Sequence, residues 1–196
     1  MIPVVILAAG RSRRMRGRDK LLEPVGGEPV LRRIVRAALA SGADGTLVVV
    51  PPDADARRGA IDGLDAEIVE ARDCAEGMAA SLQAGLAAAP KETDAVMVVL
   101  ADMPEIGAEV MGKLIAAFDP GEGREICRAV AADGTPGHPV LFGRRFFEAL
   151  AGLAGDRGAR DVVTASPEFI ADVAMAGRGP LVDLDTPEDW AAWRAR

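Results

Sequence analysis

The chain has 196 residues, of which 49% are hydrophobic and 27% are charged, and its formal net charge is −7 at pH 7. These values are typical of a soluble globular protein, and the length favours a single domain with a sizeable core. The acidic balance excludes broad nucleic-acid binding, which needs an extended basic face. The apolar runs are far shorter than the ~20 residues that cross a bilayer, so we expect no membrane span.

Cellular location is indicated by two features of the sequence. Cys74 and Cys127 stand alone, without CxxC spacing. They do not form a disulfide framework in a chain of this length, which favours a reducing cytoplasm. The apolar run at the N-terminus precedes the first basic residues, the reverse of the order in a signal peptide, so we interpret it as a strand.

Short β-branched runs alternate with longer, alanine-rich stretches in the first part of the chain. We predict strands over 3–8, 46–50, 66–71 and 95–100, and helices over 29–42, 54–64, 77–89 and 107–118. This alternation is typical of a Rossmann-like three-layer α/β fold, in which helices cover a mostly parallel central sheet. The runs 3–8, 46–50 and 95–100 are almost continuously hydrophobic, which predicts central strands buried on both faces.

After Pro120 the alternation becomes less regular. We expect short strands, a turn over 132–139, two modest helices, further strand-like segments at 171–176 and 180–185, and a final helix within 186–196. No linker or repeat separates this part from the rest. We therefore predict one domain over 1–196, in which 119–196 elaborates on the sheet formed by 1–118.

The stretch "LAAGRSRRMRGRDKLL", residues 7–22, is strongly basic in an acidic protein. Ligands of open α/β sheets bind beyond the carboxyl ends of the strands, and the small residues Ala8, Ala9 and Gly10 permit close approach there. The stretch matches neither a Walker A loop nor GxGxxG. Its basic side chains can surround a triphosphate; the alternative is a flexible, solvated basic loop. Six of the 23 Lys and Arg residues of the chain lie here: Arg11, Arg13, Arg14, Arg16, Arg18 and Lys20.

Acidic residues follow two of the predicted strands. Asp102, after the run 95–100, can hold Mg²⁺ that bridges phosphate oxygens, or it can cap the next helix. Asp183 and Asp185 alternate along a strand end, and we expect only one of them to point into a site. Asp185 precedes Thr-Pro and is also a candidate helix cap.

Other polar residues give weaker signals. His138, the only histidine, lies in the predicted turn over 132–139, with no pattern that supports a Ser/His/Asp hydrolase or a zinc site. Ser81, near the start of a predicted helix, can reach a ligand or cap that helix.

Together these segments resemble a known family. Residues 7–22 resemble the LAxGxSxRMGxxK signature of MobA-like NTP transferases, and "LADMP" resembles the metal-binding strand end of these enzymes. "GMAASLQAGL", "GHPVLF", "GDRGAR" and "DLDTPEDW", in this order, are similar to the molybdenum cofactor cytidylyltransferase branch. One difference is Arg16, which stands where the family usually has glycine, and we expect Gly17 to take over the positive φ through a shifted loop.

The resemblance implies a fold of the nucleotide-diphospho-sugar transferase type and a role for most of these residues. Residues 1–118 would be the nucleotide-binding half and 119–196 the acceptor-binding part. Lys20, Arg14 and Asp102 would be catalytic. Asp102 and Asp185 would bind Mg²⁺, with Asp183 as the substitute for Asp185. His138 and Arg157, within 133–161, would contact the acceptor. The residues implied to bind the nucleotide are Leu7, Ala8, Ala9, Gly10, Arg11, Ser12, Arg14, Lys20 and Ser81.

The implied reaction transfers CMP from CTP to a phosphate-bearing acceptor, molybdopterin cofactor, and releases pyrophosphate. "AAG" in place of the "AGG" of guanylyltransferase relatives favours cytosine. The alternatives are a guanylyltransferase that uses GTP, a cytidylyltransferase for a small alcohol phosphate, and a non-catalytic chaperone that binds nucleotide or cofactor. A molybdoenzyme or its chaperone is the protein partner that the resemblance implies, and no nucleic acid or membrane partner is expected.

Overall fold

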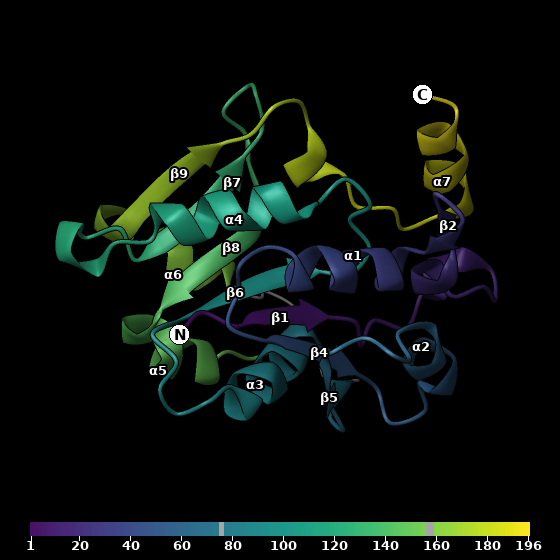
Figure 1. Cartoon of the computed structure of the whole chain (residues 1–196), viewed down its shortest axis with the longest axis horizontal. Coiled ribbons are helices and arrows are strands. Elements are labelled where there is room, and N and C mark those ends of the chain that lie inside the picture. Colours follow the sequence, from purple (N-terminus) through teal and green to yellow (C-terminus); the bar gives the residue numbers. More distant parts are fainter. Residues whose placement is uncertain (75–76, 156–158) are drawn as a thin grey trace.

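A seven-stranded sheet forms the centre of the computed structural model, which describes residues 1–74, 77–155 and 159–196 (Figure 1). All strands run parallel except β8, which is antiparallel to both of its neighbours. Across the sheet the order is β5 (Glu67–Glu70), β4 (Thr46–Val50), β1 (Val4–Leu7), β6 (Ala95–Leu100), β8 (Pro136–Gly143), β7 (Ile126–Val130) and β9 (Ile170–Ala174). The predicted Rossmann-like fold with a mostly parallel sheet is confirmed.

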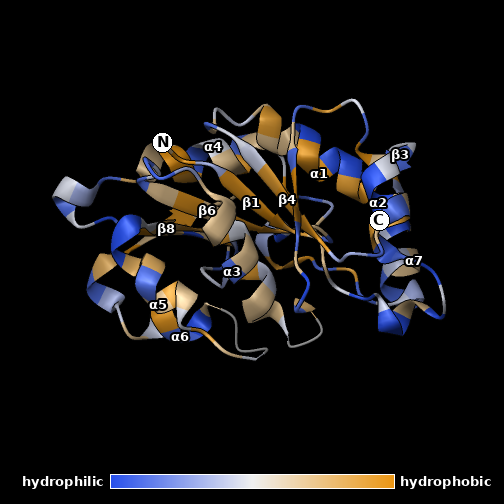
Figure 2. Ribbon diagram, turned by 90° about the horizontal axis from the view of Figure 1, so that it is seen from below, coloured by the Kyte–Doolittle hydropathy of each residue, from blue (hydrophilic) through white to orange (hydrophobic). Residues whose placement is uncertain are grey.

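Helices cover both faces of the sheet. α1 (Val30–Leu39) and α4 (Ala108–Ala117) lie on one face, and α3 (Met78–Ala88), α5 (Phe147–Ala151) and α6 (Arg160–Thr164) lie on the other (Figures 1 and 2). Because successive side chains of a strand point to opposite faces, Val4 and Ile6 belong to one core cluster and Val5 to the other. This explains why the central strands are hydrophobic at every position.

Shorter elements complete the chain. The helices α2 (Asp55–Ala60) and α7 (Pro187–Arg194) lie at the end of the sheet where β1 terminates (Figure 1). Two residue pairs form a small hairpin, β2 (Pro24–Val25) and β3 (Glu28–Pro29). The 3₁₀ turns are η1 (Arg13–Met15), η2 (Lys20–Leu22), η4 (Pro120–Glu122), η5 (Arg144–Phe146), η6 (Pro167–Phe169) and η7 (Gly179–Leu181).

The strand order creates a switch point beside β1. From β1 the chain moves to β4 and β5 on one side, and it then returns to β6 on the other side of β1. Connections that diverge in this way leave a crevice at the carboxyl ends of the strands, where ligands of such sheets bind. The loop after β1 and the loop after β6 border this crevice.

Two predicted elements differ from the structure. His138 lies in strand β8, not in a turn, because the turn is confined to 131–135, where the Ala131 N–H donates to the Thr135 carbonyl. The segment 182–185 is not a strand. It passes the end of β6 rather than running beside a strand, and its Leu184 N–H donates to the Asp102 carbonyl at 3.3 Å.

None of the helices formed by the described residues has the length and apolar character that a bilayer crossing requires.

Candidate active site

The loop after β1 is folded compactly. Its fully buried Met15 anchors it to the core. Asp19 accepts a hydrogen bond from Leu21 N–H at 3.0 Å and from the Ser12 hydroxyl at 3.1 Å, while Ser12 Oγ accepts one from Lys20 N–H at 3.2 Å. This basic stretch therefore has a defined shape that a freely solvated loop would lack.

Two neighbouring residues of this loop adopt left-handed conformations. Arg16 has φ of 52° and Gly17 has φ of 87°. The expectation that Gly17 would take over this conformation from Arg16 is wrong, since the loop uses both positions. The Arg16 guanidinium pairs with Glu188 of α7 at 2.5 Å, which fastens the strained residue to a separate element.

Lys20 lies between two carboxylates. Its ammonium group donates to Asp102 and, at 2.6 Å, to Asp185 Oδ1. The Arg14 guanidinium binds the second oxygen of Asp185, also at 2.6 Å. Burial of Lys20 disfavours its charged form, but the two carboxylates together outweigh burial and raise its pKa above the ordinary value. Lys20 thus stays protonated at neutral pH.

Neither of these acids caps a helix. The helix α4 begins at Ala108, after Gly107, and the N-cap of α7 is Thr186, whose side chain and that of Asp189 form a reciprocal capping box. Asp102 and Asp185 therefore remain free to face the crevice, and the alternative in which they are caps is wrong. The hydrogen bond from Leu184 to the Asp102 carbonyl brings their segments side by side.

Asp183 lies on the same side as Asp185. Both line one cavity, while Val182 and Leu184 are buried on the other side. The expectation that only one of the two aspartates would point into the site is wrong, because residues two apart in an extended segment share a face. The cations Arg14 and Lys20 nevertheless pair with Asp185 and not with Asp183.

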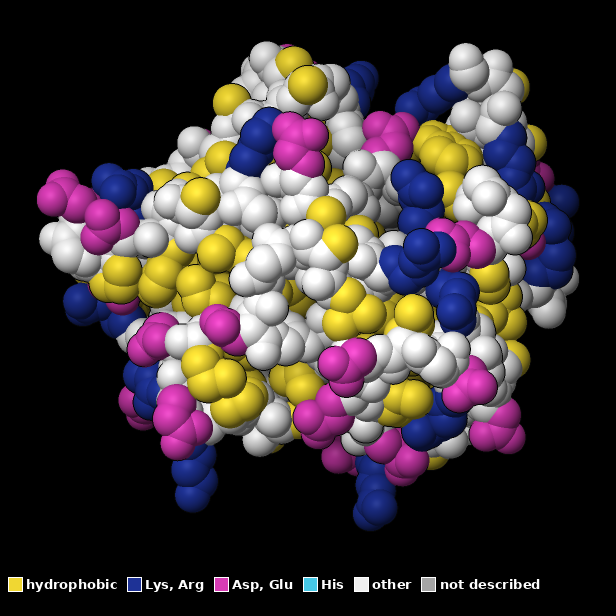
Figure 3. Space-filling view, viewed as in Figure 1, with side chains coloured by type: hydrophobic (Ala, Val, Ile, Leu, Met, Phe, Trp, Pro, Cys, Tyr) yellow, Lys and Arg dark blue, Asp and Glu magenta, His cyan; other side chains and the backbone are white. Residues whose placement is uncertain are grey.

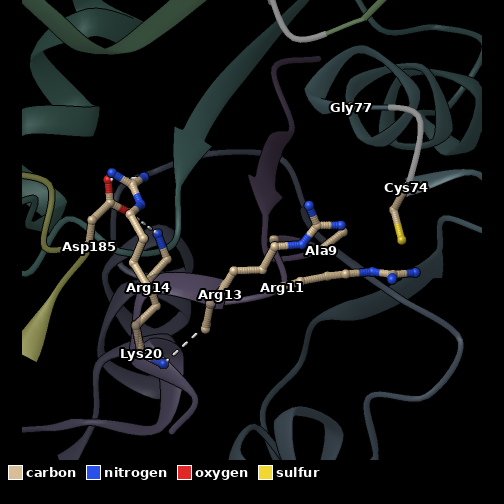
Figure 4. Close-up of a pocket in the computed structure, with 10 residues that line it drawn as sticks. Ala9, Arg11, Arg13, Arg14, Lys20, Cys74, Gly77 and Asp185 are labelled. Atoms are coloured by element: carbon tan, nitrogen blue, oxygen red, sulfur yellow. Dashed lines mark hydrogen bonds and ion pairs between the residues drawn. The ribbon is translucent and has the colours of Figure 1, made fainter. Parts of the chain in front are cut away.

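Two overlapping cavities, of about 380 and 410 Å³, open over this crevice. In Figure 4, the side chains of Arg14 and Lys20 reach Asp185, and Cys74 and Gly77 lie across the cavity from them. Figure 3 shows Lys and Arg side chains gathered on the right, where Figure 1 places α7 and the loop after β1. Of the residues predicted to bind nucleotide, those lining these cavities are Leu7, Ala9, Gly10, Arg11, Ser12, Arg14 and Lys20.

Two of the predicted nucleotide contacts lie elsewhere. Ala8 is fully buried, and its carbonyl accepts a hydrogen bond from Arg57. Ser81 is buried in the first turn of α3 and lines neither of the two cavities. Gly77 and Met78, at the start of the same "GMAAS" segment, do reach the crevice.

A third cavity of about 570 Å³ adjoins the crevice, because Leu7 and Met78 line both. His138 lines it, as do the cationic side chains of Arg128 and Arg160. Burial lowers the pKa of His138, although Asp102 and Asp183 act in the opposite direction. Within the part of the chain that the structure describes, its Nδ1 has no hydrogen-bond partner. The predicted acceptor residue Arg157 lies outside the described residues.

The carboxylates fit a small divalent cation. Asp102 and Asp185 converge on one point, where the Lys20 ammonium lies. Mg²⁺ prefers oxygen ligands and is usually bound by one or two carboxylates, together with substrate phosphates and water. Among the described residues, no group of three acidic, His or Cys side chains is arranged to hold a metal ion.

Arg57 is a further residue of the site that the sequence analysis did not identify. It is 6% exposed, and its guanidinium donates hydrogen bonds to Asp19 and to the Ala8 carbonyl in the loop after β1. Its spacing could have indicated this burial, because Ala54, Arg57 and Ile61 fall on one face of a helix. An arginine on an otherwise apolar face indicates a buried partner.

The family model of the MobA-like NTP transferase domain matches residues 4–169. The chain belongs to the MobA-like NTP transferase family. The family indicated by the signature of residues 7–22 is thus confirmed, and the chain is a nucleotidyltransferase. It is 30% identical to the purine catabolism protein PucB of Bacillus subtilis, over 95% of this chain and 92% of that protein.

Solved structures agree with this assignment. The crystal structure of Rv0371c from Mycobacterium tuberculosis is 31% identical with a TM-score of 0.86, and the match covers 100% of this chain and 98% of that chain. A complex of Rv0371c with manganese is 30% identical with a TM-score of 0.81, over 97% and 96% of the two chains. A nucleotidyl transferase from Methanothermobacter, 24% identical, shares the fold with a TM-score of 0.84, over 100% and 96%.

Proposed function

We propose that this MobA-like NTP transferase transfers CMP from CTP to the phosphate of molybdopterin cofactor and releases pyrophosphate, in a reaction that requires Mg²⁺. The observation that carries the proposal is the convergence of Lys20, Asp102 and Asp185 at the switch point of the sheet. The resemblance of residues 77–86 and 183–190 to the cytidylyltransferase branch supports the choice of CTP and of this acceptor.

The nucleotide occupies the crevice. Arg14, Lys20 and the loop after β1 bind its triphosphate, because these cations lie where the loop backbone is open to a ligand. The base lies toward Gly77, across the cavity from Asp185 (Figure 4), where Met78 also lines the crevice. The small side chain of Ala9 leaves room for it.

Asp102 and Asp185 are the residues that would hold Mg²⁺ in the complete site. The metal would supply positive charge that neutralises the phosphate groups of the nucleotide. The manganese complex of Rv0371c supports a divalent metal in this family.

The chain's own residues position the reactants. A phosphate oxygen of the acceptor attacks the α-phosphorus of CTP in line. A bond forms between these two atoms, and the bond from the α-phosphorus to the oxygen bridging to the β-phosphorus breaks. Lys20 and Arg14 stabilise the charge on the transferred group and on pyrophosphate. Because a phosphate monoester is already a nucleophile, positioning and electrostatics supply the catalysis, and no general base is required.

The acceptor occupies the third cavity. Its volume of about 570 Å³ suits an organic ligand, and its connection to the crevice through Leu7 and Met78 lets an acceptor phosphate reach the α-phosphorus. His138 and Arg160 offer polar contacts over an apolar floor that includes Leu82 and Phe142. A molybdoenzyme or its chaperone then receives the product.

The test is pyrophosphate release with Mg²⁺ and each of CTP, GTP, ATP and UTP, with and without molybdenum-loaded molybdopterin. We expect release with CTP that depends on the pterin. Release with GTP alone among the nucleotides would instead assign the guanylyl reaction. Binding of nucleotide with no release in any mixture would contradict transfer to this acceptor.

A further inference from the structure

Arg57 lies behind the loop after β1, on the separate helix α2. Its Nε and Nη2 donate to the two carboxylate oxygens of Asp19 at 2.6 and 3.0 Å. Nη2 also donates to the Gly10 carbonyl at 2.7 Å, and Nη1 donates to the Ala8 carbonyl. One guanidinium thus joins the beginning of the loop to its end.

These contacts determine where the loop presents its polar groups. Arg57 lines neither of the two overlapping cavities over the crevice. The carbonyls of Ala8 and Gly10, which accept hydrogen bonds from Arg57, are therefore directed away from these cavities. Carbonyl oxygens facing a triphosphate would repel it. Asp19, held by Arg57, in turn binds Ser12 and Leu21 and so fixes the approach of the chain to Lys20.

We infer that Arg57 is a positioning residue that holds residues 8–20 in the shape that binds a triphosphate. Removing one partner of a buried ion pair is strongly destabilising, so loss of Arg57 should release both ends of the loop together. The inference rests on the proposed role of this loop in nucleotide binding.

The test compares Arg57→Met and Arg57→Lys with Arg144→Met. Arg144 is a matched control, since it also ties down two backbone carbonyls, of Lys91 and Thr93, but next to the start of β6. Two quantities are measured at a temperature where denaturant unfolding shows each variant folded: amide hydrogen exchange of residues 8–20, and the Kd of each nucleoside triphosphate.

We expect Arg57→Met to raise exchange in residues 8–20 and to weaken nucleotide binding at least about tenfold, with Arg57→Lys intermediate and Arg144→Met within about twofold of the natural protein. Unchanged exchange in both Arg57 variants, or an equal effect of Arg144→Met, would overturn the inference. Failure of the natural protein to bind any nucleotide would instead contradict the proposed function, and the exchange measurement would still decide the role of Arg57.

A second, independent observation concerns the position of the Lys20 ammonium. It lies at the point where the two candidate metal ligands converge, and Arg14 binds the remaining oxygen of Asp185. Both carboxylates are therefore neutralised by cations of the chain itself. A divalent cation that binds between Asp102 and Asp185 must displace the Lys20 ammonium. A bound triphosphate provides phosphate oxygens with which Lys20 and Arg14 can pair instead of these aspartates.

The geometry points to Lys20 as the group that couples metal binding to nucleotide binding. The metal alone competes with the ammonium and binds weakly. When the Lys20 ammonium pairs with the triphosphate, Asp102 and Asp185 become available to the metal. The metal and the nucleotide therefore strengthen the binding of each other by the same factor.

Manganese binding to the natural protein and to Lys20→Met tests this coupling, with and without a non-hydrolysable CTP analogue. We expect Lys20→Met to bind manganese alone about tenfold more tightly and to lose most of the enhancement by the analogue. Arg16→Gln is the matched control, because it removes a charge of the same loop that pairs with Glu188 and not with these aspartates. It should change manganese affinity less than about twofold.

Adding Asp102→Asn to Lys20→Met should abolish the tighter binding, which places the metal at this carboxylate. Manganese affinity of Lys20→Met no higher than that of the natural protein would overturn the coupling. Because the measurement needs no turnover, it remains decisive if the proposed transfer reaction fails.

Discussion

The three aspartates of the crevice differ in their partners. Asp102 and Asp185 share Lys20, while Asp183 lies on the cavity wall at the same side. We predict that Asp102→Asn and Asp185→Asn each lower kcat at least about 100-fold, as loss of one group that stabilises transition-state charge commonly does. Asp183→Asn should lower it less than about tenfold. Steady-state pyrophosphate release checks this, and a larger effect at Asp183 would reassign the second metal ligand.

His138 predicts a pH dependence of stability. Burial lowers its pKa in the folded chain below the ordinary value of 6.5, although the nearby Asp102 and Asp183 favour the charged form. As the pH falls below that value, the unfolded chain therefore takes up a proton more readily than the folded chain does. The free energy of unfolding should thus decrease as the pH falls through about 6.5 and below.

Histidine changes its charge between about pH 5 and 8. The free energy of unfolding is therefore measured by denaturant at several pH values between about 7.5 and 5. In His138→Gln the decrease should be smaller, because glutamine does not titrate. Parallel curves for the two proteins would show that His138 does not titrate differently in the folded and unfolded chains.

Arg16 carries backbone strain, because it adopts a left-handed conformation with φ of 52°. Such a conformation costs a non-glycine residue roughly 1–3 kcal/mol, and a β-branched side chain tolerates it least. Arg16→Gly relieves the strain but loses the exposed pair with Glu188 and adds freedom to the unfolded chain. Its free energy of unfolding should stay within about 1 kcal/mol of the natural protein.

Arg16→Val removes the same ion pair and keeps the strain. We expect its free energy of unfolding to be about 1–2 kcal/mol lower than that of Arg16→Gly. Equal values for the two variants, measured by denaturant unfolding, would contradict a left-handed residue 16.

At the scale of elements, the contact of α3 with the sheet depends on Gly85. A Cβ at this position would lie 2.3 Å from Val5 Cγ1 and 3.0 Å from Val49 Cγ2. Although alanine favours helices over glycine, the overpacking should dominate. Gly85→Ala should lower the free energy of unfolding by about 1–3 kcal/mol.

Gly59 in α2 is the matched control, since a Cβ there meets no atom of the described residues within 4 Å. Gly59→Ala should raise the free energy of unfolding by about 0.5–1 kcal/mol through helix propensity. Thermal or denaturant unfolding of both variants gives the comparison, and stabilisation by Gly85→Ala would be incompatible with this packing of α3.

Elements with a strong hydrophobic period were predictable from the sequence. The runs 46–50 and 95–100 match β4 and β6 to the residue, and the helices near them begin and end within a few residues of their predicted limits. The segment around His138 was not predictable, because "DGTPGHP" is rich in turn residues. It forms a strand because β7 pairs with β8 on both sides of His138, through Val130 with Pro136 and Arg128 with Val140.

The candidate site was predictable in composition but less so in arrangement. Lys20 and Asp102 followed from a local signature, whereas Arg57 and its partner Asp19 are 38 residues apart and meet only in the folded chain. Short-range patterns do not encode such a contact. The same holds for Asp183 and Asp185, whose orientation depends on the packing of Val182 and Leu184.

At the scale of the whole molecule, the two walls of the crevice come from opposite ends of the chain. The loop after β1 forms one wall, and the segment before α7 forms the other, joined by the pairs Arg14–Asp185 and Arg16–Glu188. The expected division into a nucleotide-binding part, 1–118, and an acceptor-binding part, 119–196, stays a prediction. Since Asp185 comes from the second part, the nucleotide crevice would draw on both.

In the proposed reaction, the CMP group of CTP moves to the acceptor at Lys20, Asp102 and Asp185. CTP labelled at its α-phosphate, incubated with Mg²⁺ and molybdenum-loaded molybdopterin, follows this transfer directly. We expect label to appear covalently on the pterin in an amount equal to the pyrophosphate released, and Asp102→Asn to abolish both. Label recovered only as free CMP, or retained in CTP while the protein binds it, would show that this transfer does not occur.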